Sequence, residues 1–533
     1  MIKTDLQKVL RQTMLIFTCS LCSWAGAETQ PSTIPISTLP KVGTVDERFQ
    51  SYNIEMVEVT GGRFWRPYDQ QVDKILATQA ASQKSGTAQL TGLDPALFQY
   101  RSPINLNSPR LRKLARALGP AYLRVSGTWQ NSTYFADSDE PSVTDPPKGF
   151  NGILTRHRWK GVVDFAGKAD AKIVTSFATS AGTRDAAGVW TPEQAHKFLA
   201  YTKSIGGNIA AAEFMNEPTF AEIGGAPKGY SPADYGRDVA VFVPFIRREA
   251  PNMILLGPGS TGEGVTLSAM RMLKSEDLLT ATGPAFDAFS YHYYGAISTR
   301  CSLMAGGKGG ITPELALSAE WLSRTDTVEA FYAGLRDRFM PGKAMWNTET
   351  AQAACGGDRW AATFLDSFRY LGQLGSLARH GVQVVAHNTL AASDYGLIDE
   401  KTLNPRPNYW AALLWRQLMG TTVLDAGTSP AENLHLYAQC MRGQSGGVVL
   451  LAINADRATP QSIRVPEAGV RYTLTAKDLM SSEVQLNGTT LSVGNDNALP
   501  KMVGEASSTG VVTFAPASIT FLAFPKANNQ SCH

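Results

Sequence analysis

The sequence predicts an α/β protein in which a (β/α)8 TIM barrel is followed by a C-terminal antiparallel β-sandwich. From about Phe49 to about Thr422, short apolar runs alternate with amphipathic helical stretches, the pattern of a parallel sheet built from βα units. After Thr422 the apolar runs are short and separated by Gly, Asn, Asp and Pro, as in a β-sandwich. A length of 533 residues accommodates a barrel, which uses about 250 residues or more, and one smaller domain.

Residues 1–27 have the features of a secretory signal peptide. Lys3, Lys8 and Arg11 give a basic start, residues 14–24 are mostly apolar, and residues 25–27 (Ala-Gly-Ala) supply a small-residue cleavage pattern. We therefore expect cleavage near Ala27 and export, either to a periplasm or out of the cell. A buried N-terminal helix is the alternative interpretation of this segment.

Residues 45–422 contain eight candidate strands, with helical stretches between most of them. Apolar residues fall on one face of each helical stretch in Ser108–Leu118, Pro192–Ile205 and Ala233–Glu249. Eight such units match a TIM barrel. The predicted strands are Tyr52–Val59, Ala121–Val125, Lys172–Phe177, Ala211–Met215, Met253–Leu256, Ala288–Tyr291, Ala344–Trp346 and Gln383–Ala386.

The barrel is flanked by a predicted linker and by the predicted sandwich. Residues 28–44 are rich in Pro, Ser and Thr, which is typical of a linker. We expect residues 423–533 to form the sandwich. The sequence leaves open whether a strand from the N-terminal segment also joins it. The predicted sandwich strands lie in Gly447–Ile453, Gln461–Val465, Tyr472–Ala476 and Val511–Ala523.

The charge of the chain argues against several partners. The net charge is +3, and it is +1 once the three basic residues and one acidic residue of 1–27 are removed. A nucleic-acid-binding protein usually carries a strong basic excess, so we expect no nucleic-acid partner. No run of 18 consecutive apolar residues occurs, so we expect no membrane span. We expect a monomer.

Four cysteines remain beyond residue 27: Cys301, Cys355, Cys440 and Cys532. In an exported protein they allow three disulfide pairings, among which the sequence does not choose. Their wide spacing does not fit a zinc site, and we expect no metal ion.

Two glutamates carry the chemical prediction. Glu217 follows the fourth predicted strand in Asn216-Glu217-Pro218, where Pro218 ends the strand and Asn216 can bind a sugar hydroxyl. Glu349 ends the seventh predicted strand. The carboxyl ends of TIM-barrel strands carry catalytic groups, and two carboxylates about 5–5.5 Å apart are the machinery of a retaining glycosidase. We therefore expect Glu217 to be the acid/base and Glu349 the nucleophile; a chance turn at residues 216–218 is the alternative.

The sixth predicted strand ends in His292, Tyr293 and Tyr294. A histidine or tyrosine at this point can donate a hydrogen bond to the nucleophile and keep it ionised. The alternative is aromatic packing at the barrel rim.

In the combination of these motifs, the chain resembles glycoside hydrolase family 79, the heparanase and β-glucuronidase family. The resemblance runs from about Phe49 to the C-terminus. The segments that carry it are residues 111–124, Asn216-Glu217-Pro218, His292-Tyr293-Tyr294, residues 346–349 followed by Gly356-Gly357, residues 394–399 and residues 407–410.

The resemblance implies a glucuronate bound beside the two glutamates. It implies that the backbone N–H groups of Gly356 and Gly357 and the hydroxyl of Tyr395 hold the sugar carboxylate, and that Glu55 binds sugar hydroxyls. Successive glycine amides can form such an anion site without a net basic charge. The family also has a sugar-contacting loop that matches Ser126, Gly127 and Thr128, and it needs no cofactor.

The resemblance also bears on the cysteines and on activation. The family's cysteine pair matches Cys440 with Cys532, and with that pair taken from the family we expect Cys301 to pair with Cys355. Family members activated by excision of a linker carry it after the second strand, where this chain has only about 131–156. We therefore expect no such activation.

The function that the sequence predicts is a retaining β-glucuronidase that releases β-linked glucuronic acid from glycans or glucuronides. The closest alternative is a heparanase-like endo-β-glucuronidase that cuts within heparan sulfate or a related polysaccharide. A non-catalytic carbohydrate-binding protein is the alternative from another class, and the presence of both glutamates argues against it.

Overall fold

A computed structural model describes residues 31–84, 94–139, 144–265, 272–305 and 310–533. The predicted signal peptide therefore lies outside the described residues. Eight parallel strands close into a barrel, and each of the eight predicted strands overlaps one of them. The barrel strands are β2 (Gln50–Glu55), β5 (Ala121–Ser126), β8 (Ala171–Ser176), β9 (Ile209–Glu213), β10 (Ile254–Ser260), β11 (Ala288–Tyr294), β12 (Met345–Ala351) and β13 (Val382–His387).

The first predicted strand, Tyr52–Val59, is too long at its C-terminal end. The strand stops at Glu55, and Met56–Thr60 forms the short helix α1. The cause is a reciprocal cap, because the backbone N–H of Glu55 donates to the Glu58 carboxylate at 2.7 Å and the Glu55 side chain accepts from the backbone N–H of Glu58. Glu55 therefore sits where the chain turns from strand to helix at the mouth of the barrel.

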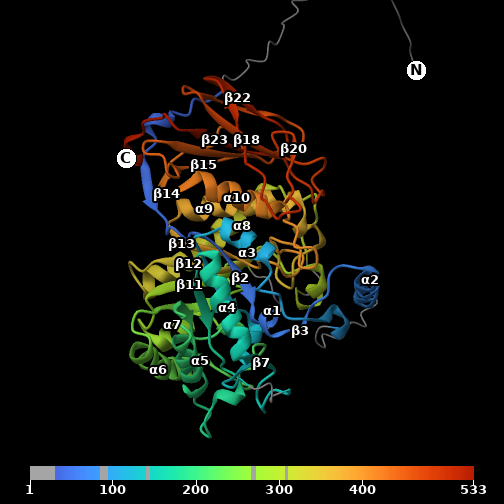
Figure 1. The fold of residues 1–533 in the computed structure, drawn as a ribbon, viewed down its shortest axis with the longest axis vertical. Coiled ribbons are helices and arrows are strands. Elements are labelled where there is room, and N and C mark those ends of the chain that lie inside the picture. The colour runs from blue at the N-terminus through green and yellow to red at the C-terminus, as the bar shows by residue number, and fades with distance from the viewer. Residues whose placement is uncertain (1–30, 85–93, 140–143, 266–271, 306–309) are drawn as a thin grey trace, which may run out of the picture.

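Helices surround the barrel (Figure 1), and the three helical segments singled out in the sequence are present as α3, α5 and α6. Ser108 caps α3 and Pro109 begins it, a favoured pairing at a helix start. The helices are α2 (Gln70–Lys84), α3 (Pro109–Ala117), α4 (Arg156–Ala169), α5 (Glu193–Ser204), α6 (Pro232–Glu249), α7 (Ser275–Thr282), α8 (Ala319–Phe339), α9 (Phe364–Arg379) and α10 (Pro407–Leu418). Short strand pairs β3 (Gly62–Trp65) with β4 (Phe98–Arg101) and β6 (Thr133–Ala136) with β7 (Gly152–Thr155) decorate the barrel.

The C-terminal part is a nine-stranded antiparallel sheet with a second, two-stranded sheet packed on it. The large sheet has the order β1-β14-β15-β16-β23-β18-β19-β20, with β21 also paired to β18, and the small sheet pairs β17 with β22. The strands are β1 (Lys41–Thr44), β14 (Met419–Leu424), β15 (Leu434–Met441), β16 (Val448–Asn454), β17 (Gln461–Val465), β18 (Gly469–Thr475), β19 (Gln485–Leu486), β20 (Thr489–Thr490), β21 (Glu505–Ser507), β22 (Gly510–Phe514) and β23 (Ser518–Phe524).

The predicted linker 28–44 is wrong for the part that the structure describes. Lys41–Thr44 forms β1, which pairs antiparallel with β14 at the edge of the large sheet (blue beside orange in Figure 1). Ile34, Ile36 and Leu39 are buried in the core between the two sheets. Regularly placed apolar side chains thus anchor a segment whose Pro, Ser and Thr content suggested a linker.

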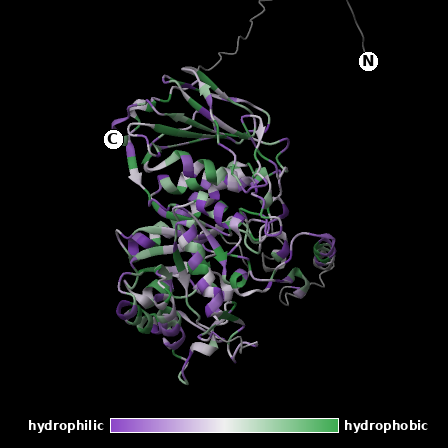
Figure 2. Cartoon of the chain, viewed as in Figure 1, coloured by the Kyte–Doolittle hydropathy of each residue, from purple (hydrophilic) through white to green (hydrophobic). Residues whose placement is uncertain are grey.

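The central strands β16 and β23 of the large sheet are buried along their whole length, and hydrophobic residues colour much of the central sheet in Figure 2. In β16, Val448 and Leu450 pack in the core shared with the two-stranded sheet, whereas Leu451 and Ile453 pack in the core that contains α9 and α10. Side chains alternate between the faces of a strand, which explains this division. One apolar core therefore runs from the barrel through α9 and α10 to the sheet.

Both expected disulfides are present. Cys440 and Cys532 have Cα atoms 5.3 Å apart, and their bond ties the C-terminus to β15. Cys301 and Cys355 have Cα atoms 6.4 Å apart and join the loops after β11 and β12. Among the described residues, no helix has the length and apolar character needed to cross a membrane.

Candidate active site

The carboxyl ends of the barrel strands surround a cleft of about 280 Å³. Its floor carries carboxylates and hydroxyls, and its walls carry aromatic rings from the loops. The lining residues used below are Glu55, Trp65, Thr128, Trp129, Asn131, Asn216, Glu217, Phe220, Tyr294, Glu349, Asn388 and Tyr395. Strands β2, β11 and β12 and the loops after β2, β5, β9 and β13 contribute to this set, so the cleft exists only because the barrel closes.

Glu217 and Glu349 face each other across this floor. Glu349 is part of β12, whereas Glu217 lies beyond the end of β9 and has a left-handed backbone with φ of 48°. Asn131 holds the neighbouring Asn216 at both backbone groups, with two hydrogen bonds of 2.8 Å. One carboxylate oxygen of each glutamate and a ring nitrogen of His292 all lie within 4.8 Å of one another.

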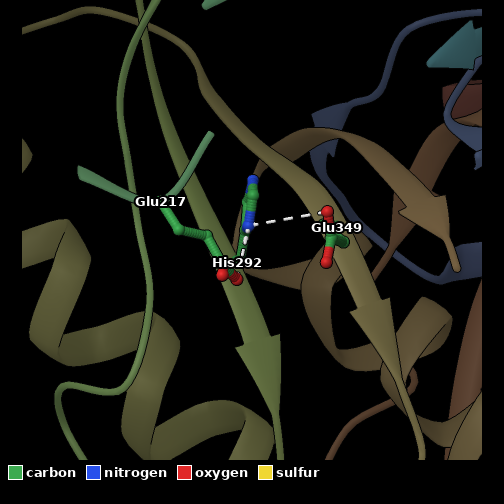
Figure 3. Close-up of side chains that lie close together, drawn as sticks. All are labelled: Glu217, His292 and Glu349. Carbon is green, nitrogen blue, oxygen red and sulfur yellow. Dashed lines mark hydrogen bonds and ion pairs between the residues drawn. The ribbon is translucent and has the colours of Figure 1, made fainter. Parts of the chain in front are cut away.

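His292 lies between the two glutamates (Figure 3). Its Nδ1 is 3.1 Å from Oε1 of Glu217 and 3.7 Å from Oε2 of Glu349. Burial alone would lower the pKa of His292, but the charge of Glu349 and hydrogen bonds to Glu213 and Glu217 raise its pKa to about 9. The neighbouring glutamates therefore favour the protonated form of the ring.

Arg124 of β5 is a second buried cation, and the sequence analysis gave it no role. It is 1% exposed. Its guanidinium donates to Glu349 at 2.7 Å, to Glu213 at 2.9 Å and to the side-chain oxygen of Asn216 at 2.8 Å. Glu213, the last residue of β9, also accepts from Thr348 at 2.6 Å. Arg124 thus fixes the orientation of the Glu349 carboxylate and of the residue that precedes Glu217.

The two glutamates differ in their proton affinity. Burial acts to raise the pKa of Glu349, but His292, Arg124 and a hydrogen bond from Tyr294 outweigh it and hold that pKa below its usual range. Burial, with the charge of Glu349, raises the pKa of Glu217 despite its contact with His292. The Tyr294 hydroxyl donates to Glu349 at 2.6 Å. The pKa of Glu349 is thus held below its usual range and that of Glu217 above it, the order that a nucleophile and a proton donor require.

The cluster of Glu217, His292 and Glu349 has enough ligand atoms for a metal ion, but its surroundings oppose one. The pKa of His292 is raised to about 9, although a metal ligand must be the neutral imidazole. The Arg124 guanidinium already contacts Glu349 and His292, and its charge would repel a dication.

The predicted carboxylate site lies on the loop after β12. Gly356 and Gly357 have φ of 81° and 79°, the left-handed region in which glycine is unstrained. Within the described residues, neither backbone N–H donates to a protein acceptor. Their carbonyl oxygens are engaged instead, Gly357 by Arg300 at 2.8 Å and Gly356 by the backbone N–H of Asp394 at 3.1 Å. The Tyr395 ring packs against Gly357 and lines the cleft.

Arg300 is a further buried cation that the sequence analysis did not single out. It is 1% exposed, forms an ion pair with Asp394 and lies over the ring of Tyr68 at 3.9 Å. Its contacts with the carbonyl oxygens of Cys355 and Gly357 hold the glycine loop from behind. The ion pair neutralises the charge, so Arg300 acts on the loop chiefly through its hydrogen bonds.

The other predicted sugar-binding residues have different positions. Glu55 and Thr128 line the cleft. Gly127 allows Glu55 to reach it, since a Cβ atom on Gly127 would lie 1.6 Å from a carboxylate oxygen of Glu55. Ser126 is buried, and its hydroxyl hydrogen-bonds that of Ser176 at 2.6 Å.

Tyr293 is placed wrongly by the sequence prediction. Successive side chains of β11 point to opposite faces of the strand, so His292 and Tyr294 share one face and Tyr293 lies on the other. His292 and Tyr294 hydrogen-bond the glutamates, whereas Tyr293 is 4% exposed and packs in the core outside the barrel. It is not one of the described residues that line the cleft.

Replacing His292 by Gln is expected to move the pH profile of kcat/KM to higher pH on both limbs. Loss of His292 removes an interaction that lowers the pKa of Glu349, so the acid limb of the profile moves to higher pH. It also removes the hydrogen bond that lowers the pKa of Glu217, so the alkaline limb moves to higher pH as well. A nearby opposite charge shifts a carboxyl pKa by roughly one to three units, which sets the expected displacement. A profile that stays in place would contradict the electrostatic role; His196→Gln, on the exposed face of α5, is the control.

The barrel and its paired carboxylates define the class of enzyme, which is a TIM-barrel glycoside hydrolase. The solved structure of a 4-O-α-L-rhamnosyl-β-D-glucuronidase from Fusarium oxysporum 12S shares the fold, with a TM-score of 0.61, 12% identity, and coverage of 92% of this chain and 100% of that one. The family model described as glycosyl hydrolase family 79, N-terminal domain, matches residues 101–375, about half of the chain. The chain belongs to glycosyl hydrolase family 79.

Curated relatives extend the similarity over most of the chain. Heparanase-like protein 1 of Arabidopsis thaliana is 28% identical over 72% of this chain and 71% of its own length. Heparanase of Gallus gallus is 27% identical, covering 80% of this chain and 90% of its own length. Baicalin-β-D-glucuronidase of Scutellaria baicalensis is 24% identical, covering 79% of this chain and 84% of its own length.

Proposed function

We propose that this protein is a retaining β-glucuronidase that hydrolyses β-linked glucuronic acid from glycans or glucuronides. One observation carries the substrate assignment: among the described residues two adjacent glycine amides have no protein acceptor, and the second, Gly357, packs against Tyr395, which lines the cleft together with both glutamates. The names of the curated relatives, heparanase and baicalin-β-D-glucuronidase, support a glucuronide substrate.

The proposed mechanism is a double displacement. Glu217 protonates the glycosidic oxygen while the ionised Glu349 attacks the anomeric carbon and forms a glycosyl-enzyme. Glu217, now deprotonated, takes a proton from water, which attacks the same carbon and releases Glu349. One carboxylate oxygen of Glu217 lies within 4.8 Å of one carboxylate oxygen of Glu349. This short distance supports retention, because an inverting enzyme needs carboxyl groups about 6.5–9.5 Å apart to admit a water molecule.

Neutral donors are proposed to bind the glucuronate carboxylate. The N–H groups of Gly356 and Gly357 form a concave anion site, and the Tyr395 hydroxyl supplies a third donor. Arg300 lies behind this loop but is paired with Asp394, so the carboxylate meets oriented dipoles rather than a free cation. With this arrangement a substrate carboxylate can bind near the two catalytic carboxylates without a free cation that would neutralise them.

Tyr395→Phe is expected to lower kcat/KM for an aryl β-glucuronide by roughly 5- to 150-fold. The buried carboxylate would lose one hydrogen-bond partner, which costs about 1–3 kcal/mol. The matching aryl β-glucoside, which lacks the carboxylate, is expected to be a poor substrate of both enzymes and to lose much less on mutation. Steady-state kinetics on the two substrates check this, and equal losses on both would contradict a role in carboxylate binding.

Hydrolysis of a chromogenic aryl β-glucuronide tests the function itself. Turnover with release of the β-anomer of glucuronic acid, followed by NMR, is the expected result. Comparable turnover of the aryl glucoside would overturn the substrate assignment and leave the glycosidase mechanism standing. Sizing the products from heparan sulfate separates removal of terminal residues from the heparanase-like alternative, in which internal cuts shorten the chain rapidly.

We also propose that the protein is exported. Two disulfides support this, since such bonds persist in oxidising compartments. N-terminal sequencing of the mature protein tests the expected cleavage near Ala27.

A further inference from the structure

Asn388 follows β13 directly and lies on the floor of the cleft, although no sequence motif drew attention to it. It is 1% exposed, and its backbone N–H donates to Thr350 of the neighbouring strand β12 at 2.8 Å. Its side chain is therefore held in place by the barrel and directed among the residues that surround Glu349.

The amide nitrogen of Asn388 meets three oxygens at once. It is 3.0 Å from Oε1 of Glu55, 3.0 Å from the Tyr294 hydroxyl and 3.2 Å from the Tyr395 hydroxyl. The Tyr294 hydroxyl has a single proton, which it donates to Glu349. Because its oxygen accepts from Asn388, the tyrosine keeps that proton directed at Glu349.

The other end of the amide has no partner. Oδ1 of Asn388 is fully buried and accepts no hydrogen bond from the described residues, and the same holds for Oε2 of Glu55. The amide is assigned this way round because its two N–H bonds then face two acceptors, the Glu55 carboxylate and the Tyr294 oxygen, whose own proton goes to Glu349. A buried acceptor without a donor is costly, so its donor is expected to come from a bound molecule.

We propose that Asn388 both binds and positions: its carbonyl oxygen accepts a hydrogen bond from one ring hydroxyl of the sugar, and its amide directs the Tyr294 proton to Glu349. The inference rests on the proposed glucuronidase function. It defines the substrate more narrowly, as a sugar whose hydroxyl at that position is free. Methylation removes the donor there, and sulfation would in addition bring a charge against Glu55 and Glu349.

Mono-deoxy substrates test the direct contact. Asn388→Ala is expected to lower kcat/KM for an aryl β-glucuronide by roughly 5- to 150-fold. For one of the 2-, 3- and 4-deoxy analogues, the variant and the wild type are expected to be equally active, because that substrate lacks the hydroxyl that Asn388 binds. An equal penalty on all three analogues overturns the contact. Asn404→Ala, in an exposed loop, is the matched control.

The pH profile tests the positioning role, and Asn388→Leu provides an uncharged variant of similar size if the alanine variant folds poorly. Either substitution removes the amide donor to Tyr294, so the acid limb of kcat/KM is expected to move to higher pH as Glu349 loses its hydrogen bond. In a Tyr294→Phe background the same substitution is expected to move the limb less. An acid limb that stays in place in the single variants overturns the positioning role. If the wild type does not hydrolyse the parent glucuronide, the proposed function itself fails, a result distinct from either outcome for Asn388.

Discussion

Glu349→Gln is expected to reduce hydrolysis of an aryl β-glucuronide by on the order of 10⁴-fold or more, the scale of loss seen when an enzyme loses its nucleophile. The amide is nearly isosteric with the carboxylate but cannot form the glycosyl-enzyme. Because Arg124 and Tyr294 hold this side chain at 2.7 and 2.6 Å, the substitution should leave the site assembled while removing the charge that they orient.

The measurement is steady-state turnover together with covalent labelling by a 2-fluoro-glucuronide with a good leaving group, followed by mass spectrometry. The wild-type enzyme should be labelled at Glu349, and the variant should not be labelled. Glu320→Gln, on the exposed side of α8, is the control and should behave as the wild type. Labelling at another carboxylate would refute Glu349 as the nucleophile.

Glu217→Gln is expected to discriminate between leaving groups. For a glycan or an alkyl glucuronide, loss of the proton donor should reduce kcat by about 10²- to 10⁴-fold. For a dinitrophenyl glucuronide, whose phenolate leaves without protonation, the first step should survive and the glycosyl-enzyme should accumulate. A burst of released phenol followed by slow turnover is the expected time course.

Rescue of the Glu217→Gln variant by azide is the decisive test of the acid/base role. The second step needs a base only because water must lose a proton, so an anionic nucleophile should restore turnover and give β-glucuronosyl azide. Retention of configuration in that product would also report the double displacement. Equal losses for good and poor leaving groups, with no rescue, would argue that Glu217 is not the acid/base.

Much of this site follows from local sequence patterns. Strand-end glutamates in the barrel pattern, one of them in Asn216-Glu217-Pro218, sufficed to predict which carboxylates face each other, since parallel strands present the same ends to one side. The barrel strands themselves were predictable because each is a short apolar run between helical stretches. The end of the first strand was not, because the cap between Glu55 and Glu58 overrides the apolar run that continues through Val59.

The residues that were missed depend on closure of the barrel. Arg124 and Glu349 are 225 positions apart, and Asn388 and Glu55 are 333 apart, so no local window relates them. Arg124 did leave a signal, since a charged residue between Leu123 and Val125 in a buried strand must find partners. Asn388 left none. The error at Tyr293 was avoidable, because strand alternation puts it opposite to its two neighbours.

The apolar core that runs from the barrel helices into the C-terminal sheet makes the catalytic half dependent on the rest of the chain. α9 and α10 face the barrel on one side and the sheet on the other, and β1, from the start of the described chain, completes that sheet. Removing the sheet would leave two nearly all-buried helices facing water. An unrelated accessory module could replace the sheet only if it covered the same apolar faces of α9 and α10.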